Sequence, residues 1–252
     1  MYTNIRYILI TALRDWLFVG LMLGVLIASS ISVVLGGTAF IEEQEMTLSY
    51  ASASSRVVLM VGIIVFVCFH IRHSFDNKEI DVILSKPISR NNLIVSYLLG
   101  FSLVGLLLTL PVIAIIFLIG INDWTGFMVW SASFILEMIM IVSFSLFAAF
   151  TMRSAVTSVL ACMGFYVISR MMAFFVMTAD NPMFNDTKYI LIKWVLKIIA
   201  IITPRLDFYS KSEWLVYGIN DAMDWQLYLL QSLIFIPLLV TATIIDFRHR
   251  QF

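Results

Sequence analysis

Six stretches of this chain are apolar over nearly the whole length that a helix needs to cross a bilayer, which restricts its possible folds. About 20 consecutive apolar residues carry an α-helix through the hydrocarbon core. A helix also satisfies its own backbone hydrogen bonds, as lipid requires. The expected spans cover residues 16–36, 53–71, 93–120, 127–150, 154–178 and 227–246. The sequence therefore predicts an all-α integral membrane protein with six transmembrane helices.

Composition supports a single membrane domain over residues 1–252. Hydrophobic residues make up 61% of the chain and charged residues 13%, whereas soluble domains are about a quarter charged. The formal net charge is zero, so no attraction to nucleic acid is expected. The lipid bilayer is the expected surrounding.

Two further helical segments complete the predicted fold. Residues 1–15 have the pattern of an amphipathic helix that lies at the membrane surface. The stretch 188–204 is interrupted by Lys193 and Lys197, so its apolar part is too short to span. We expect it to form a re-entrant or interfacial helix within an outer segment, 179–226.

The distribution of Lys and Arg among the short loops predicts the orientation. Loops 37–52 and 121–126 contain neither residue, so they are expected outside. The long segment 179–226 is also expected outside, because long loops follow this rule poorly. Both termini would then lie in the cytoplasm. The basic residues assigned to the cytoplasmic side are Arg6, Arg14, Arg72, Lys78, Lys86, Arg90, Arg153, Arg248 and Arg250.

Glu137 and Arg170 are ionisable residues inside expected spans. A charge in the hydrocarbon region is costly and usually has a partner. Counted from the outer ends of their helices, the two residues lie at similar depths, so they are expected to form an ion pair. The pair could fix the register of two helices, or it could line a substrate path.

Sequence motifs for catalysis or metal binding are missing. The chain has neither a glycine-rich phosphate loop nor a His-Glu-x-x-His motif, so we expect no nucleotide site and no bound cofactor. His70 and His73 have a spacing that can hold a metal on a helix. Arg72 between them would repel a cation, and no metal site is expected.

The most polar passage is "NKEIDVILSKPISRNN", residues 77–92. It is amphipathic, and Pro87 would end a short helix there because proline disfavours helical geometry in the residue before it. The following "SRNN" supplies side chains that can cap the next span. An amphipathic cytoplasmic element in a chain without a nucleotide site suggests docking to another protein. A solvated connector is the alternative.

The longer passage "FDNKEIDVILSKPISRNNLIVSYLLG" resembles the connection between the second and third spans of ABC-2-type transporter permeases. The resemblance is carried by Glu79, Leu84, Pro87, Ser89, Arg90, Tyr97 and Gly100. The stretch 202–218 is weakly similar to a proline-containing stretch of that family. The family plan is also similar: a surface helix, six spans, and a re-entrant hairpin before the last span.

This resemblance implies that the loop 72–92 holds a cytoplasmic coupling helix, seated in a cleft of a separate ATPase subunit. Two ATPase subunits, which bind ATP and Mg²⁺, would pair with two permease copies, expected to be a homodimer. The chain would be no enzyme itself, and would export an amphipathic or lipid-like substrate. The resemblance also implies the inner (plasma) membrane of a bacterium as the location. The implied coupling residues are Asp76, Lys78, Glu79, Asp81, Val82, Ile83, Leu84, Lys86, Pro87 and Arg90.

The second and fifth spans of such permeases usually face the substrate path. The residues that this implies as path lining are Phe66, Phe69, Met171, Phe174 and Phe175. Two other classes stay open: a lipid-modifying membrane enzyme, and an ion-coupled secondary transporter that uses Glu137. The first would need clustered Asp, His or Ser at one membrane surface. The second would predict inverted repeats or paired broken helices.

Overall fold

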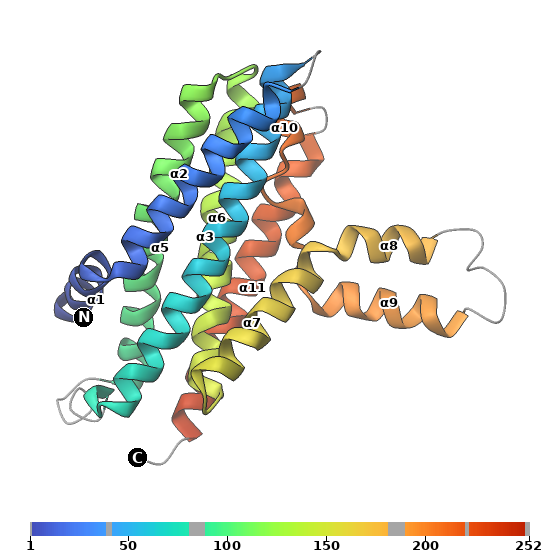
Figure 1. Cartoon of the computed structure of the whole chain (residues 1–252). Coiled ribbons are helices and arrows are strands. Elements are labelled where there is room, and N and C mark those ends of the chain that lie inside the picture. Colours follow the sequence, from blue (N-terminus) through green and yellow to red (C-terminus); the bar gives the residue numbers. More distant parts are fainter. Residues whose placement is uncertain (1, 39–41, 81–88, 181–189, 220–221, 250–252) are drawn as a thin grey trace.

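A computed structural model describes residues 2–38, 42–80, 89–180, 190–219 and 222–249, and every regular element among them is a helix (Figure 1). The predicted all-α class is confirmed for this part of the chain. The elements are α1 (Tyr2–Arg14), α2 (Trp16–Gly36), α3 (Glu43–Asp76), α5 (Arg90–Ile119), α6 (Trp124–Thr151), α7 (Ala155–Arg170), α8 (Met172–Asp180), α9 (Ile190–Ile202), η3 (Leu206–Phe208), α10 (Glu213–Tyr217) and α11 (Ala222–His249).

Five of these helices are long and apolar enough to cross a membrane: α2, α3, α5, α6 and residues 225–249 of α11. A sixth span exists if α7 and α8 are counted together, although they meet at a bend of 48°. The fifth expected span, 154–178, is therefore two helices. Arg170 ends α7 and donates hydrogen bonds to the carbonyls of Leu206 and Tyr209, outside the helix, where the chain changes direction.

The centre of the bundle is formed by α3 and α6. In the most apolar window of each helix, 61% of α3 and 67% of α6 is buried, against 17% of α2. Figure 1 shows the remaining long helices around this pair. Large side chains of α6, such as Trp130, Phe134 and Phe150, are fully enclosed. The residues of α2 that face away from α3 can therefore contact lipid or another chain.

Polar side chains fix the starts of three long helices. Asp15 accepts a hydrogen bond from the Leu17 N–H at the start of α2, and Ser89 accepts one from Asn92 at the start of α5. Ser89 therefore acts as the cap that the sequence predicts. At the start of α6, the Thr125 hydroxyl and the Gly126 N–H hold the pKa of Asp123 below its usual range.

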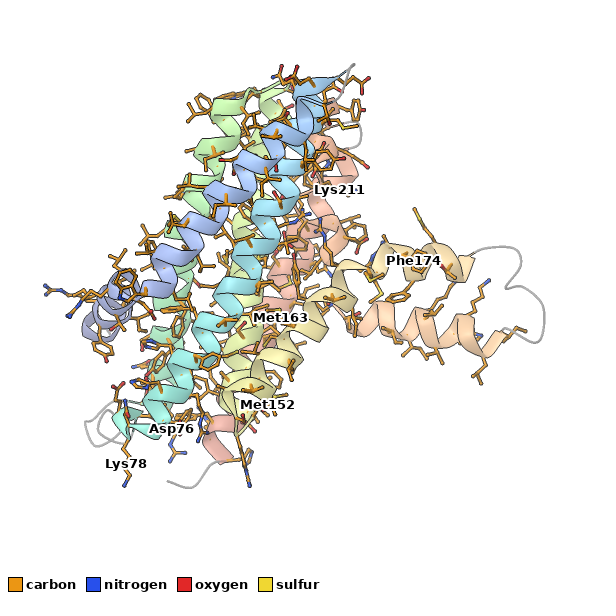
Figure 2. All side chains as sticks on the ribbon, in the orientation of Figure 1. Asp76, Lys78, Met152, Met163, Phe174 and Lys211 are labelled. Carbon is orange, nitrogen blue, oxygen red and sulfur yellow. The ribbon has the colours of Figure 1, made fainter. Side chains whose placement is uncertain are left out.

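The predicted N-terminal helix is present as α1, which is separate from α2. Its Ile8 and Ala12 are buried, and Ile8 packs beside Gly100 of α5. Tyr7 and Leu13 are about half exposed. Helix α1, the C-terminal end of α11 and the end of α3 that holds Asp76 lie in the same half of the bundle (Figures 1 and 2). This arrangement fits a surface helix at one face of a membrane.

Two short helices, α8 and α9, form a hairpin that projects sideways from the bundle (Figure 1). We call this hairpin the arm. The segment expected to be a re-entrant or interfacial helix is α9. Apolar side chains of the arm are exposed, among them Phe174, Met177, Leu191 and Trp194, and Figure 2 shows Phe174 on it. Such a surface suits an apolar environment.

The predicted orientation can be measured by labelling single cysteines. Glu43→Cys and Glu213→Cys should react with an impermeant thiol reagent from outside, and Lys78→Cys only from inside, because these three positions are exposed. The native Cys68 and Cys162 are buried, and serine replaces them in the background. Labelling of Glu213→Cys only from the cytoplasm would mean that the segment before it crosses the membrane, and would overturn the predicted topology.

Candidate functional site

The structure brings Glu137 of α6 and Arg170 of α7 together inside the bundle. Arg170 Nη1 lies 3.7 Å from Glu137 Oε1. Glu137 is fully buried, whereas a quarter of the Arg170 side chain is exposed. The carboxylate therefore sits where an uncompensated charge would cost most. The similar depth of the two residues along their helices was the signal in the sequence that predicted this contact.

A third charged residue, Arg56 of α3, joins them and was missed by the sequence analysis. It is 6% exposed, and its Nη1 donates a hydrogen bond to the carbonyl of Ser210. The signal was available, because Arg56 is a lone cation within the expected span 53–71. We call Arg56, Glu137 and Arg170 the charged cluster. With two cations and one anion, its formal charge is +1.

The charged cluster holds the segment 205–212, which contains η3 and is otherwise non-helical, within the bundle. The Ser210 hydroxyl donates to Glu137 Oε2 at 2.8 Å, and the Ser210 N–H donates to the Ser133 hydroxyl at 3.0 Å. Arg170 donates to the Tyr209 carbonyl at 2.9 Å. Non-helical backbone at membrane depth is tolerated where protein groups satisfy its polar atoms. The side chains of Ser133 and Arg170 provide hydrogen-bond partners for the backbone of this segment.

Arg170 also occupies the base of the arm. The arm leaves the bundle directly after Arg170 and returns just before Leu206, and Arg170 donates to the Leu206 carbonyl. Tyr209 ties the returning chain to α11, because its hydroxyl lies 2.9 Å from the Tyr228 carbonyl and 2.8 Å from the Ser232 hydroxyl. The charged cluster thus joins α3, α6, α7 and the returning end of the arm.

The expected coupling residues are only partly within the described residues. Asp76 ends α3 and pairs with Arg72 at 2.6 Å. Glu79 accepts hydrogen bonds from Ser74 at 3.0 Å and from Tyr7 of α1 at 3.4 Å. Lys78 is exposed. The residues that lie outside the described part are Asp81, Val82, Ile83, Leu84, Lys86 and Pro87.

Arg90, at the other end of this connection, contacts the last turn of α11. Its Nη1 donates to the carbonyls of Phe247 at 3.2 Å and Arg248 at 3.3 Å. Its guanidinium also lies 5.8 Å from the centre of the Phe247 ring. The final carbonyls of a helix lack partners within the helix. Arg90 therefore anchors the C-terminal end of α11 to the start of α5.

The five residues implied as path lining fall into two groups. Phe66 and Phe69 of α3 line a pocket beside α1, to which Met171, Phe174 and Phe175 do not contribute. Phe66 is buried, whereas Phe69 is half exposed. Met171 lies at the bend between α7 and α8, and Phe174 and Phe175 belong to the arm. A path lined by all five stays a prediction.

The two histidines have aromatic and amide neighbours. The His70 ring lies 5.6 Å from the Phe66 ring and 5.3 Å from the Phe101 ring, and His73 Nε2 lies 2.8 Å from Asn77 Nδ2. Within the described ranges, no group of three or more His, Cys, Asp or Glu side chains is placed to hold a metal ion. Comparison of the sequence with protein-family models and with curated proteins finds no match.

Proposed function

We propose that this chain is the membrane subunit of an ATP-binding-cassette exporter, in which two permease copies pair with two separate ATPase subunits. The observation that carries the proposal is the connection 76–90. It is polar and amphipathic, it joins two long apolar helices, and it lies in a chain without a nucleotide-binding motif. The resemblance to ABC-2-type permeases over the same residues supports this assignment.

The fold supplies a mechanical reason why a force on this connection would reach the middle of the membrane. Helix α3 has 34 residues without interruption, which corresponds to about 50 Å. It begins at Glu43, passes through Arg56, and ends at Asp76 beside the connection. A displacement of the connection by an ATPase would therefore move Arg56 and the segment that it holds.

The second end of the connection is tied to α11. Arg90 bonds to the last carbonyls of α11, and α11 in turn holds Tyr209 through Tyr228 and Ser232. A movement of segment 76–90 would thus act on residues 205–212 from two sides, through α3 and through α11. In this proposal, ATP-driven closure of the ATPase pair rearranges that segment and the arm, and an amphipathic or lipid-like substrate moves outward between the permease copies.

The experiment replaces the apolar anchors of the connection. Ile83→Asp combined with Leu84→Asp should abolish co-purification of the ATPase subunit expressed together with the permease, because interface energy concentrates in a few buried side chains. The permease should still enter the membrane. Arg153→Asp is the matched control, since Arg153 is exposed in the turn between α6 and α7. Wild-type ATPase stoichiometry in the double variant would refute the coupling assignment.

Ion-coupled transport through Glu137 is the alternative, and the charged cluster argues against it. Glu137 is fully buried, lies 3.7 Å from a cationic side chain and accepts a hydrogen bond from Ser210. A cation that binds Glu137 would have to compete with Arg170 for the carboxylate. Transport that follows an ion gradient in the absence of any ATPase would favour this alternative.

A further inference from the structure

A groove between α1, the start of α2 and the second half of α3 lies apart from the charged cluster and includes Phe66 and Phe69. One pocket of about 360 Å³ is lined by Thr11, Asp15, Leu17, Phe66, Phe69, His70 and His73. An open hollow of about 540 Å³ is lined by Tyr7, Ile10, Thr11, Arg14 and Asp15. The two hollows share Thr11 and Asp15, so they adjoin, and we call them together the α1–α3 groove.

The groove is apolar at one end and polar at the other. Phe66 and His73 are seven residues apart on α3, which places them about 10 Å apart along the helix. Phe66 and Phe69 form the apolar wall, further from the end of α3. His73 lies one turn before that end, near Asp15 at the α1–α2 junction. This order fits an elongated amphipathic molecule whose polar group lies at the membrane surface.

The polar end presents opposite charges on adjacent residues, Arg14 and Asp15. Asp15 Oδ1 accepts a hydrogen bond from Leu17 N at 3.0 Å, which fixes the carboxylate beside the groove, while its other lone pairs can accept further bonds. The Arg14 guanidinium is suited to phosphate. His70 also lines the pocket, but its Nε2 is buried and has no hydrogen-bond partner within the described residues.

We propose that the α1–α3 groove binds a membrane phospholipid whose headgroup carries both a phosphate and a primary ammonium. Arg14 holds the phosphate, Asp15 accepts from the ammonium, and the first part of an acyl chain lies along Phe66 and Phe69. Two features favour this occupant. The opposite charges of Arg14 and Asp15 match those of a zwitterionic headgroup, and the apolar wall favours a ligand with an acyl chain over free phosphate. Lipid binding in this groove does not require the chain to be a transporter.

The test measures the lipids retained by the purified full-length chain in native mass spectrometry. Phosphatidylethanolamine, phosphatidylcholine and phosphatidylglycerol are added with identical acyl chains. The ethanolamine lipid should be retained most, because choline has no N–H and glycerol has no cation. Asp15→Asn should lower its occupancy about fivefold, the upper range for an exposed ion pair, and leave phosphatidylglycerol unchanged. Asparagine still caps a helix, so α2 should start as before.

Arg14→Gln should weaken all three lipids, because each contains the phosphate. Arg153→Gln is the control for general attraction of lipid to exposed cations, and it should change none of them. Equal retention of the three lipids by the wild-type chain would overturn the proposal without any variant. An unchanged ethanolamine preference in Asp15→Asn, or an equal loss in Arg153→Gln, would overturn it as well.

Discussion

Glu137→Gln should be among the most destabilising single changes in this protein. It leaves Arg56 and Arg170 without the carboxylate that attracts both of them, and raises the formal charge of the cluster from +1 to +2. Removing one partner of a buried pair costs on the order of 3–5 kcal/mol, because the other charge stays buried. The lower part of that range is expected, since a quarter of the Arg170 side chain is exposed. Thermal or denaturant unfolding in detergent measures the loss.

The order of the variants tests whether the charges act together. Arg170→Gln should cost less than Glu137→Gln, because it leaves Arg56 and Glu137 as a neutral pair, although the Leu206 and Tyr209 carbonyls lose a donor. The double variant restores the wild-type formal charge and should recover part of the loss. Glu213→Gln, at an exposed carboxylate, is the control. Additive losses in the double variant would show that Glu137 and Arg170 are energetically independent.

Arg56 shows why the sequence predicts only part of this cluster. The depth of a residue along a helix can be counted from the sequence, so two charges on neighbouring helices can be matched. The partner of Arg56 is a backbone carbonyl of Ser210, 154 residues away along the chain. Every residue has a backbone carbonyl, so the sequence does not indicate which carbonyl binds Arg56. Contacts of this kind follow only from the tertiary fold.

The same limit applies to the bend at Met171. Residues 154–178 are apolar enough to predict one straight span, and local pattern gives no reason to divide them. In the structure, Arg170 donates hydrogen bonds to two carbonyls of the chain that returns from the arm. Helix α8 lies beside α9 and does not continue in the direction of α7. The positions of the other long helices were predictable because lipid requires about 20 apolar residues in sequence. The cap that Ser89 provides for α5 was predicted as well, since capping is local.

The last expected result concerns Gly126, where α10 lies against the first turn of α6. A Cβ at this glycine would stand 1.9 Å from the carbonyl oxygen of Trp214. Because that oxygen belongs to the backbone, α10 would have to move as a whole. Trp214 and Leu215 are buried in this contact region, and Gly218, just after α10, lies close to Asp123. Gly126→Ala should therefore destabilise the fold by about 1–3 kcal/mol, as overpacking does.

Gly164→Ala on α7 is the matched control, since a Cβ there meets nothing within 4 Å. Alanine is the better helix former, so this control should be neutral or stabilise by up to about 1 kcal/mol. The opposite signs separate the clash at Trp214 from the general effect of replacing a helical glycine. If both alanine variants unfold at the same temperature, α10 does not pack against α6 as the structure places it. The attachment of segment 205–218 to the bundle would then rest on the charged cluster, on Tyr209, and on the hydrogen bonds of Ser210 and Ser212 to Ser133 and Ser52.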